Sequence, residues 1–169
     1  MNAADAIGLA LEAAEEGLAL GELPIGAVVL LGDDVIGRAH TQERALRLRI
    51  VHADLMAMLE ADARLGPGRP PAPLTLAVTL EPCLMCLGAA MTLGVGRVLY
   101  GLESPGDGGV ALVSQWAPPQ ELPFFRRPAL TLGGVRRAEA QAQFARYAAF
   151  ECAPPGTRSW ARGLAGRPR

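Results

Sequence analysis

Three metal-binding side chains and a nearby carboxylate form the most informative pattern in the chain. His52 stands two positions before Asp54, and Cys83 and Cys86 follow about thirty residues later in C-x-x-C spacing. One imidazole and two thiolates are typical of tetrahedral zinc with one position left for water. Zinc lowers the pKa of that water to about 7, so a zinc-bound hydroxide exists at neutral pH. We expect the Asp54 carboxylate to act as the proton shuttle for this hydroxide.

The two cysteines allow other interpretations. A redox dithiol has the same spacing, but it does not require a histidine beside a carboxylate, so we favour zinc. A structural zinc needs a fourth protein ligand, for which Cys152 and His40 are the candidates. Neither has a recognisable ligand spacing, so we favour a catalytic site. We expect Glu81, just before Pro82, to be a structural hydrogen-bond acceptor.

The composition limits the class of protein. With 169 residues, half of them apolar, the chain is long enough for one buried core. We assign residues 1–152 to a single domain and residues 153–169, rich in Pro, Gly and Arg, to a loosely attached tail. No apolar run reaches the ~20 residues that span a bilayer, and the acidic start is unlike a signal peptide. We therefore expect a cytoplasmic protein without a membrane partner, and Cys152, without an obvious disulfide partner, fits a reducing compartment.

The basic residues exclude chemistry that depends on lysine, and their distribution bears on nucleic-acid binding. All sixteen are arginine, which rules out a Schiff-base lysine and the lysine of a phosphate-binding P-loop. The net charge is −1 at pH 7, yet nine arginines lie from Arg126 onward. Such a basic region could contact phosphate. We favour a solvated surface, so nucleic acid is a possible but not a favoured partner.

The predicted helices and strands alternate along the chain, and they must position the metal-binding residues. Alternation of this kind favours an α/β fold, one sheet with helices on both faces. Both ligand segments fall at helix starts, where the helix dipole stabilises thiolates and hydroxide. Apolar spacing and turn residues predict helices over 3–20, 51–65, 82–93, 110–116 and 138–150, and strands over 27–31, 35–37, 74–80, 95–100 and 129–132.

Together these motifs resemble the cytidine deaminase superfamily, and most closely its branch of tRNA adenosine deaminases and guanine deaminases. H-x-E followed by P-C-x-x-C is the signature of zinc nucleobase deaminases. The similarity covers about residues 5–150 and rests on segments 23–28, 35–37, 52–54, 79–86 and 96–101. The resemblance implies a three-layer α/β/α sandwich with a mixed five-stranded sheet, one Zn²⁺ per subunit and a homodimer.

The resemblance also implies a reaction and a set of site residues. The reaction is hydrolytic removal of an exocyclic amine from a nucleobase, nucleoside or similar aminated heterocycle. His52, Cys83 and Cys86 are the implied zinc ligands, and Asp54 is the implied proton shuttle. We expect Trp116 near a wall of the site. The expected substrate contacts are Thr41, Pro24, Ala53, Pro82, Glu103 and Ser104.

Two positions depart from the family pattern. Asp54 replaces a glutamate and is about an ångström shorter, a displacement that can cost ~10²-fold in rate. Thr41 replaces an asparagine, and a hydroxyl does not reproduce the paired donor and acceptor of an amide. These changes favour a small substrate over tRNA. The alternatives are a tRNA adenosine (wobble) deaminase and a non-catalytic zinc-binding relative in which Asp54 marks lost proton transfer.

Overall fold

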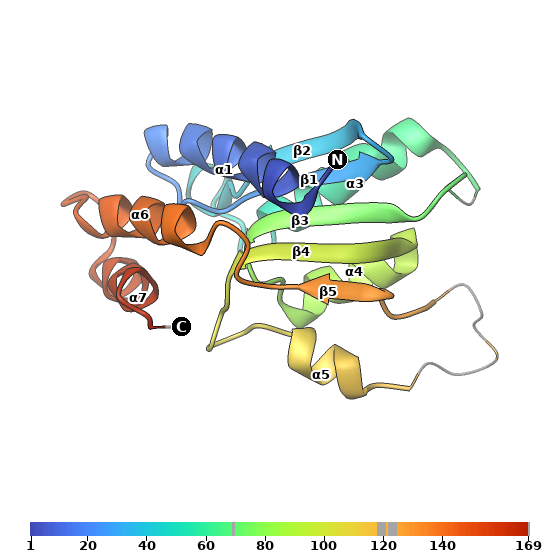
Figure 1. Ribbon diagram of the computed structural model, residues 1–169. Helices are drawn as coiled ribbons and strands as arrows, with labels where there is room; N and C mark the ends of the chain where they lie inside the picture. Colours follow the sequence, from blue (N-terminus) through green and yellow to red (C-terminus); the bar gives the residue numbers. More distant parts are fainter. Residues whose placement is uncertain (69, 118–120, 122–124, 169) are drawn as a thin grey trace.

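A five-stranded mixed sheet forms the centre of the structure (Figure 1). The computed structural model describes residues 1–68, 70–117, 121 and 125–168. In spatial order the strands are β2 (Asp34–His40), β1 (Gly26–Leu31), β3 (Leu74–Leu80), β4 (Val95–Leu102) and β5 (Leu130–Leu132). β1 runs antiparallel to β2 and β3, whereas β3, β4 and β5 run parallel to one another. The expected mixed sheet of an α/β fold is confirmed.

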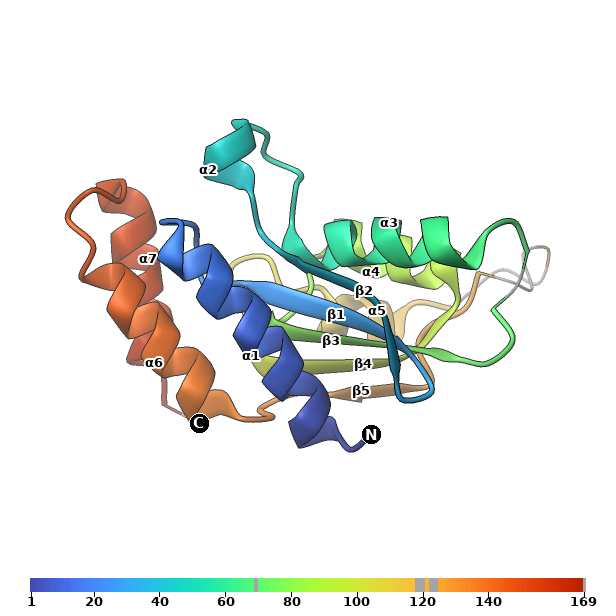
Figure 2. The ribbon, with the colours of Figure 1, turned by 90° about the horizontal axis from the view of Figure 1, so that it is seen from above.

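Helices cover both faces of this sheet (Figure 2). Side chains alternate along β1, so Val28 and Leu30 join one core cluster and Ala27 and Val29 join the other. The three-layer arrangement expected from the sequence is therefore confirmed. The first layer contains α1 (Ala3–Ala19), α6 (Arg137–Ala148) and α7 (Pro155–Ala165), and the second contains α3 (Ala53–Leu65) and α4 (Leu84–Leu93), with α5 (Val110–Gln115) beside α4.

Local signals explain where the main helices begin and end. The Asn2 side chain accepts a hydrogen bond from the backbone N–H of Asp5 at 2.9 Å and so caps α1. Gly66 ends α3 with a φ of 68°, a conformation that glycine adopts without strain. A Cβ atom on Gly37 would collide with the carbonyl of Ala57, so this glycine lets α3 lie directly against β2.

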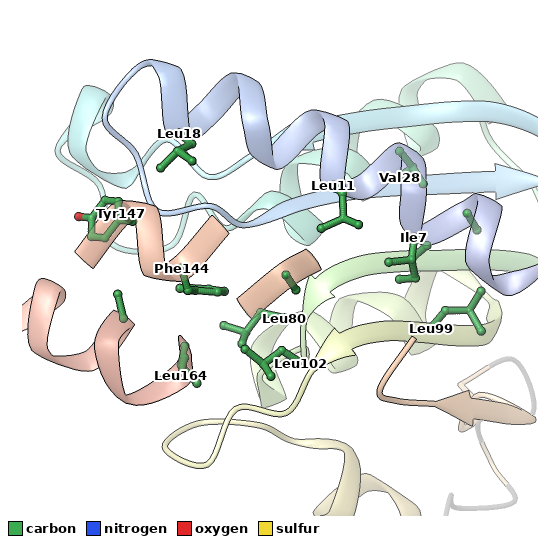
Figure 3. Close-up of a cluster of buried hydrophobic side chains, with 14 of the residues drawn as sticks. Ile7, Leu11, Leu18, Val28, Leu80, Leu99, Leu102, Phe144, Tyr147 and Leu164 are labelled. Carbon is green, nitrogen blue, oxygen red and sulfur yellow. The ribbon is translucent and has the colours of Figure 1, made fainter. Parts of the chain in front are cut away.

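The C-terminal segment differs from the loosely attached tail expected from its composition. Residues 155–165 form α7, whose Ala161 and Leu164 are buried. Trp160 packs edge-on against Phe144 of α6 with ring centroids 5.9 Å apart. Figure 3 shows Leu164 in the same cluster as Phe144 and Tyr147. This packing places α7 at the end of the molecule where α3 begins (Figure 2).

A second unexpected element is the short helix α2 (Glu43–Leu46), which projects from the body of the protein (Figure 2). The buried Glu22 carboxylate accepts hydrogen bonds from the backbone N–H groups of Arg44 and Ala45, at 3.2 and 2.7 Å. Tertiary contacts therefore hold its first turn, because four residues are too few to form a stable helix alone. Within the described ranges, no helix combines the length and apolarity needed to cross a bilayer.

Candidate active site

Two helix starts bring the predicted metal ligands together. His52 is the N-cap of α3 and Cys83 the N-cap of α4, with Cys86 in the first turn of α4. The Nδ1 atom of His52 lies 3.6 Å from the sulfur of Cys83 and 3.6 Å from the sulfur of Cys86. All three ligand atoms lie within 4.8 Å of one another. Residues far apart in the sequence therefore form one group, as predicted.

The spacing of these atoms fits zinc. With zinc–sulfur distances of about 2.3 Å and zinc–nitrogen distances of 2.0–2.1 Å, tetrahedral geometry separates the nitrogen from each sulfur by about 3.6 Å. The two observed separations agree with this value. His40 and Cys152 do not belong to the group of ligands found among the described residues. His40 Nδ1 lies 2.8 Å from the Thr41 carbonyl, and Cys152 is exposed, so the donor set suits a three-ligand site.

Hydrogen bonds within this group shift the pKa values of all three ligand side chains. The Cys86 thiol donates to the Cys83 sulfur, and this bond is the main cause that lowers the pKa of Cys83 to about 4. The same bond raises the pKa of Cys86. The hydrogen bond between His52 and Cys83 raises the pKa of His52 to about 9. These shifts favour the thiolate of Cys83, whereas Cys86 and His52 hold their protons more tightly, so zinc would displace those protons on binding.

Asp54 lies beside the ligands in spite of its short side chain. It is the second residue of α3 and only 4% exposed, and its Oδ1 accepts a hydrogen bond from the Leu55 N–H at 3.1 Å. Burial raises the pKa of this carboxyl, and a hydrogen bond from the Cys86 thiol opposes the rise. A raised pKa makes a carboxyl a better proton acceptor, which suits a group that transfers protons.

A pocket of about 430 Å³ opens onto this group. Thr41 and Ala53, two of the predicted substrate contacts, line it together with Asp54. The described residues of its wall are Leu23, Ile25, Thr41, Glu43, His52, Ala53, Asp54, Val78, Leu80, Glu81, Cys83, Asp107, Gly156, Thr157 and Trp160. Four of these carry carboxylates and none is an arginine, so the wall is acidic.

The other four predicted substrate contacts lie outside the described lining, and one of them, Ser104, contacts a lining residue. The Pro24 carbonyl accepts a hydrogen bond from Thr79, and the Pro82 carbonyl accepts one from the Gly109 N–H. Glu103 pairs with Arg137. The buried Ser104 donates its hydroxyl proton to Asp107 at 2.5 Å, and Asp107 does line the pocket. Direct contact of these four residues with a substrate stays a prediction.

Glu81 is a structural hydrogen-bond acceptor, as predicted. Its Oε2 accepts a hydrogen bond from the Ser104 N–H, and its Oε1 accepts one from the Val110 N–H, both at 3.1 Å. The carboxylate thus ties the loop after β4 to the end of β3. The loop carries Asp107 into the pocket wall.

Several residues of the pocket were missed by the sequence analysis. Trp116 packs edge-on against Phe125 at 5.4 Å and is not part of the described lining, whereas Trp160 of α7 is. The spacing of Trp160, Ala161 and Leu164 is helical and could have predicted α7. Glu43 begins the four-residue helix α2 and Asp107 lies in the loop after β4, and neither has a sequence periodicity that would identify it.

The comparisons with known proteins agree with this geometry. Residues 2–102 match the family described as the cytidine and deoxycytidylate deaminase zinc-binding region. The tRNA-specific adenosine deaminase of Streptococcus pyogenes serotype M1 is 41% identical over 101 residues, 60% of this chain and 58% of the relative. The tRNA(Ile)-lysidine synthase of Deinococcus radiodurans is 40% identical over 136 residues, 80% of this chain and 22% of the relative. The chain thus spans less than two thirds of either curated relative.

Solved structures show the same similarity. A structure from a study of A-to-I editing by tRNA:A34 deaminases at the wobble position of transfer RNA superposes with a TM-score of 0.69 and 30% identity, covering 82% of this chain and 98% of that one. The guanine deaminase from Nitrosomonas europaea gives a TM-score of 0.65 at 24% identity, over 85% and 83% of the two chains. The second similarity concerns the fold alone.

Proposed function

Since the chain belongs to the cytidine and deoxycytidylate deaminase zinc-binding family, we propose that it is a zinc-dependent hydrolase that removes an exocyclic amine from a small aminated heterocycle. One observation carries the proposal: three zinc-type ligands and a buried carboxylate meet at one pocket. His52, Cys83 and Cys86 would hold the zinc ion. Asp54 would transfer protons.

The proposed chemistry requires one water and returns ammonia. When bound, zinc supplies a Lewis acid that lowers the pKa of a coordinated water to about 7. Asp54 accepts a proton from the attacking water and delivers it to the ring nitrogen of the substrate. Asp54 then carries the second proton to the departing amine. The ring carbon exchanges its amine for a carbonyl oxygen, and ammonia leaves.

The pocket supports a substrate without phosphate. Its volume of about 430 Å³ is near the lower end of the range for small-molecule sites. The carboxylates of Glu43 and Asp107 in its wall would repel a phosphate group. The Thr41 hydroxyl donates to the Val51 carbonyl at 3.2 Å, which leaves its oxygen lone pairs to accept a hydrogen bond from a substrate N–H. We therefore propose a free base or nucleoside.

The test of this function is ammonia release from a panel of free bases, nucleosides and amino-triazines by zinc-loaded protein. We expect release from at least one uncharged compound and a slower reaction with the matching nucleotide. Equal or faster turnover of the nucleotide would contradict the proposed substrate class. Silence with every compound would contradict small-molecule deamination.

A tRNA adenosine deaminase is the second candidate. Two relatives that are named for their action on tRNA are about 40% identical to the chain. In addition, Arg44, Arg47 and Arg49 are exposed in the segment between Thr41 and His52, both of which line the pocket. Arginines at this place could contact the phosphates on either side of a reactive base.

The second candidate predicts a steep dependence on salt. Deamination of an RNA stem-loop should lose ~10³-fold or more in apparent affinity between about 50 and 200 mM salt if several phosphates are contacted. Arg49→Gln should weaken binding and reduce the slope of the logarithmic salt plot by about one. A flat salt response, or no reaction with the stem-loop, would count against this candidate.

We also propose that the chain forms a homodimer through the outer surface of α3, α4 and α5. Leu59 of α3, Leu84 of α4 and Leu112 of α5 are all more than half exposed. An apolar groove between α3 and α4 adjoins Leu59. Exposed apolar surface is characteristic of protein–protein contacts, and a second copy is the occupant implied by the resemblance to deaminases.

Leu59→Glu should convert the dimer into a monomer. The side chain is 56% exposed in the single chain, and a buried charge at a contact would raise the dissociation constant by at least about tenfold. Sedimentation velocity across a concentration series measures this. Leu20→Glu is the matched control, because Leu20 is 73% exposed at the end of α1, in the other helix layer. A wild-type protein that is monomeric at every concentration of the series would contradict the proposed dimer.

A further inference from the structure

We infer that Glu43 is a positioning residue that holds the His52 ring in its metal-binding orientation. The inference depends on only one part of the proposed function, namely that His52, Cys83 and Cys86 form a zinc site. The two nitrogens of the histidine ring contact different groups, and Glu43 lies at one of them.

These two nitrogens face different partners. Nδ1 points to the two cysteine sulfurs at 3.6 Å, and Nε2 lies 3.4 Å from Oε1 of Glu43. A histidine that binds metal through Nδ1 carries its ring proton on Nε2. A carboxylate near that N–H fixes the tautomer and the ring orientation, and it makes the metal-binding nitrogen more basic. Glu43 is the carboxylate at this position.

The backbone around Glu43 is held from both sides. Glu22 accepts hydrogen bonds from the N–H groups of Arg44 and Ala45, the two residues that follow Glu43. On the other side, the Thr41 hydroxyl and the Gln42 N–H both donate to the Val51 carbonyl, at 3.2 and 3.3 Å. The segment that projects as α2 therefore returns to the body of the protein beside His52.

The His52 ring itself has little support from its own helix. His52 is the N-cap residue of α3, but its side chain makes no N-cap hydrogen bond. The ring is also 28% exposed. Its orientation therefore depends on the groups that meet its two nitrogens, and Glu43 is the one on the side away from the cysteines.

Zinc affinity measured by competition with a chromogenic chelator tests this inference. Glu43→Ala should weaken zinc binding about 10- to 100-fold, which is the usual effect of losing such a partner. Glu43→Gln keeps an acceptor oxygen and should fall between wild type and Glu43→Ala. Asp107→Asn is the matched control: it removes one negative charge from another part of the pocket wall and leaves the pair of Glu43 and His52 in place. The control should change affinity by less than about twofold.

Three results would overturn the inference. The first is a Glu43→Ala protein that binds zinc within about twofold of wild type. The second is an Asp107→Asn protein that loses as much affinity as Glu43→Ala, since negative charge alone would then explain the effect. The third is a metal-free Glu43→Ala protein with a much lower melting temperature, which would indicate a general structural role.

The measurement separates this inference from the proposed function because no substrate is present. Tight zinc binding that weakens in Glu43→Ala, without ammonia release from any compound, would contradict the function and support the inference. Active wild-type enzyme with zinc affinity unchanged in Glu43→Ala would support the function and overturn the inference.

Discussion

Asp54→Asn should keep its zinc and lose its activity. The amide has almost the same shape as the carboxylate, but it cannot accept a proton from water, and positioned proton transfer contributes about 10²- to 10⁴-fold to rate. The expected result is a fall in kcat of that order on any substrate that the wild type deaminates, with zinc still bound at one ion per chain. Turnover close to wild type would contradict the role assigned to Asp54.

The conservative change Asp54→Glu distinguishes an active site that has adapted to aspartate from one that has lost proton transfer. Asp54 is hydrogen-bonded to the Cys86 thiol and lines the pocket, so an added methylene would move the carboxyl relative to both. If the site has adapted to aspartate, Asp54→Glu should lower activity or change substrate preference. If proton transfer has been lost, as in the non-catalytic alternative, glutamate should raise activity from nothing. No change would mean that position 54 does not carry the proton.

Cys86→Ala should abolish tight zinc binding and, with it, activity. Removing one of three protein ligands leaves the ion with two, too few for either a structural or a catalytic zinc site. Because zinc binds the folded protein, it should raise the melting temperature of the wild type by several degrees at saturating metal. The same addition should leave the melting temperature of Cys86→Ala almost unchanged. Metal content and a thermal scan with and without zinc measure both effects.

Cys152→Ala is the matched control for the loss of a thiol. Cys152 is exposed and lies outside the ligand group, whereas Cys86 is buried within it. Each variant is compared with its own metal-free form, so the small cavity left at position 86 does not affect the comparison. Zinc binding by Cys86→Ala at wild-type affinity would show that the ligand set is wrong.

The parts of the fold that follow from local signals could be predicted from the sequence. The short β-prone run of β1 and the alternating Thr and apolar residues of β3 predicted strands, and the structure has them. His52 and Cys83 were expected at helix starts, and both are N-cap residues. Periodicity and turn residues act over a few positions, so they identify elements that would form in most tertiary contexts.

The parts that were missed depend on distant contacts. α2 exists because the carboxylate of Glu22, about twenty residues earlier, meets its first turn. The N-cap Pro154 and the first residues of α7, Pro155 and Gly156, resemble a loop in sequence, and the helix is held by packing of Trp160 on Phe144. Glu43 reaches His52 only through the folded loop between them. Glu22 and Glu43 have no spacing that a single sequence could reveal, whereas the helical spacing of Trp160, Ala161 and Leu164 could have predicted α7.

The most direct test of the central claim is titration of metal-stripped protein with zinc while ammonia release is followed across the panel of bases and nucleosides. We expect no release without metal, a linear rise to a plateau at one zinc per chain, and release that is at least about a hundredfold slower at every zinc level from Asp54→Asn. Full activity in the stripped protein, or silence with every compound at one bound zinc per chain, would contradict the claim that this is a zinc-dependent deaminase of small heterocycles.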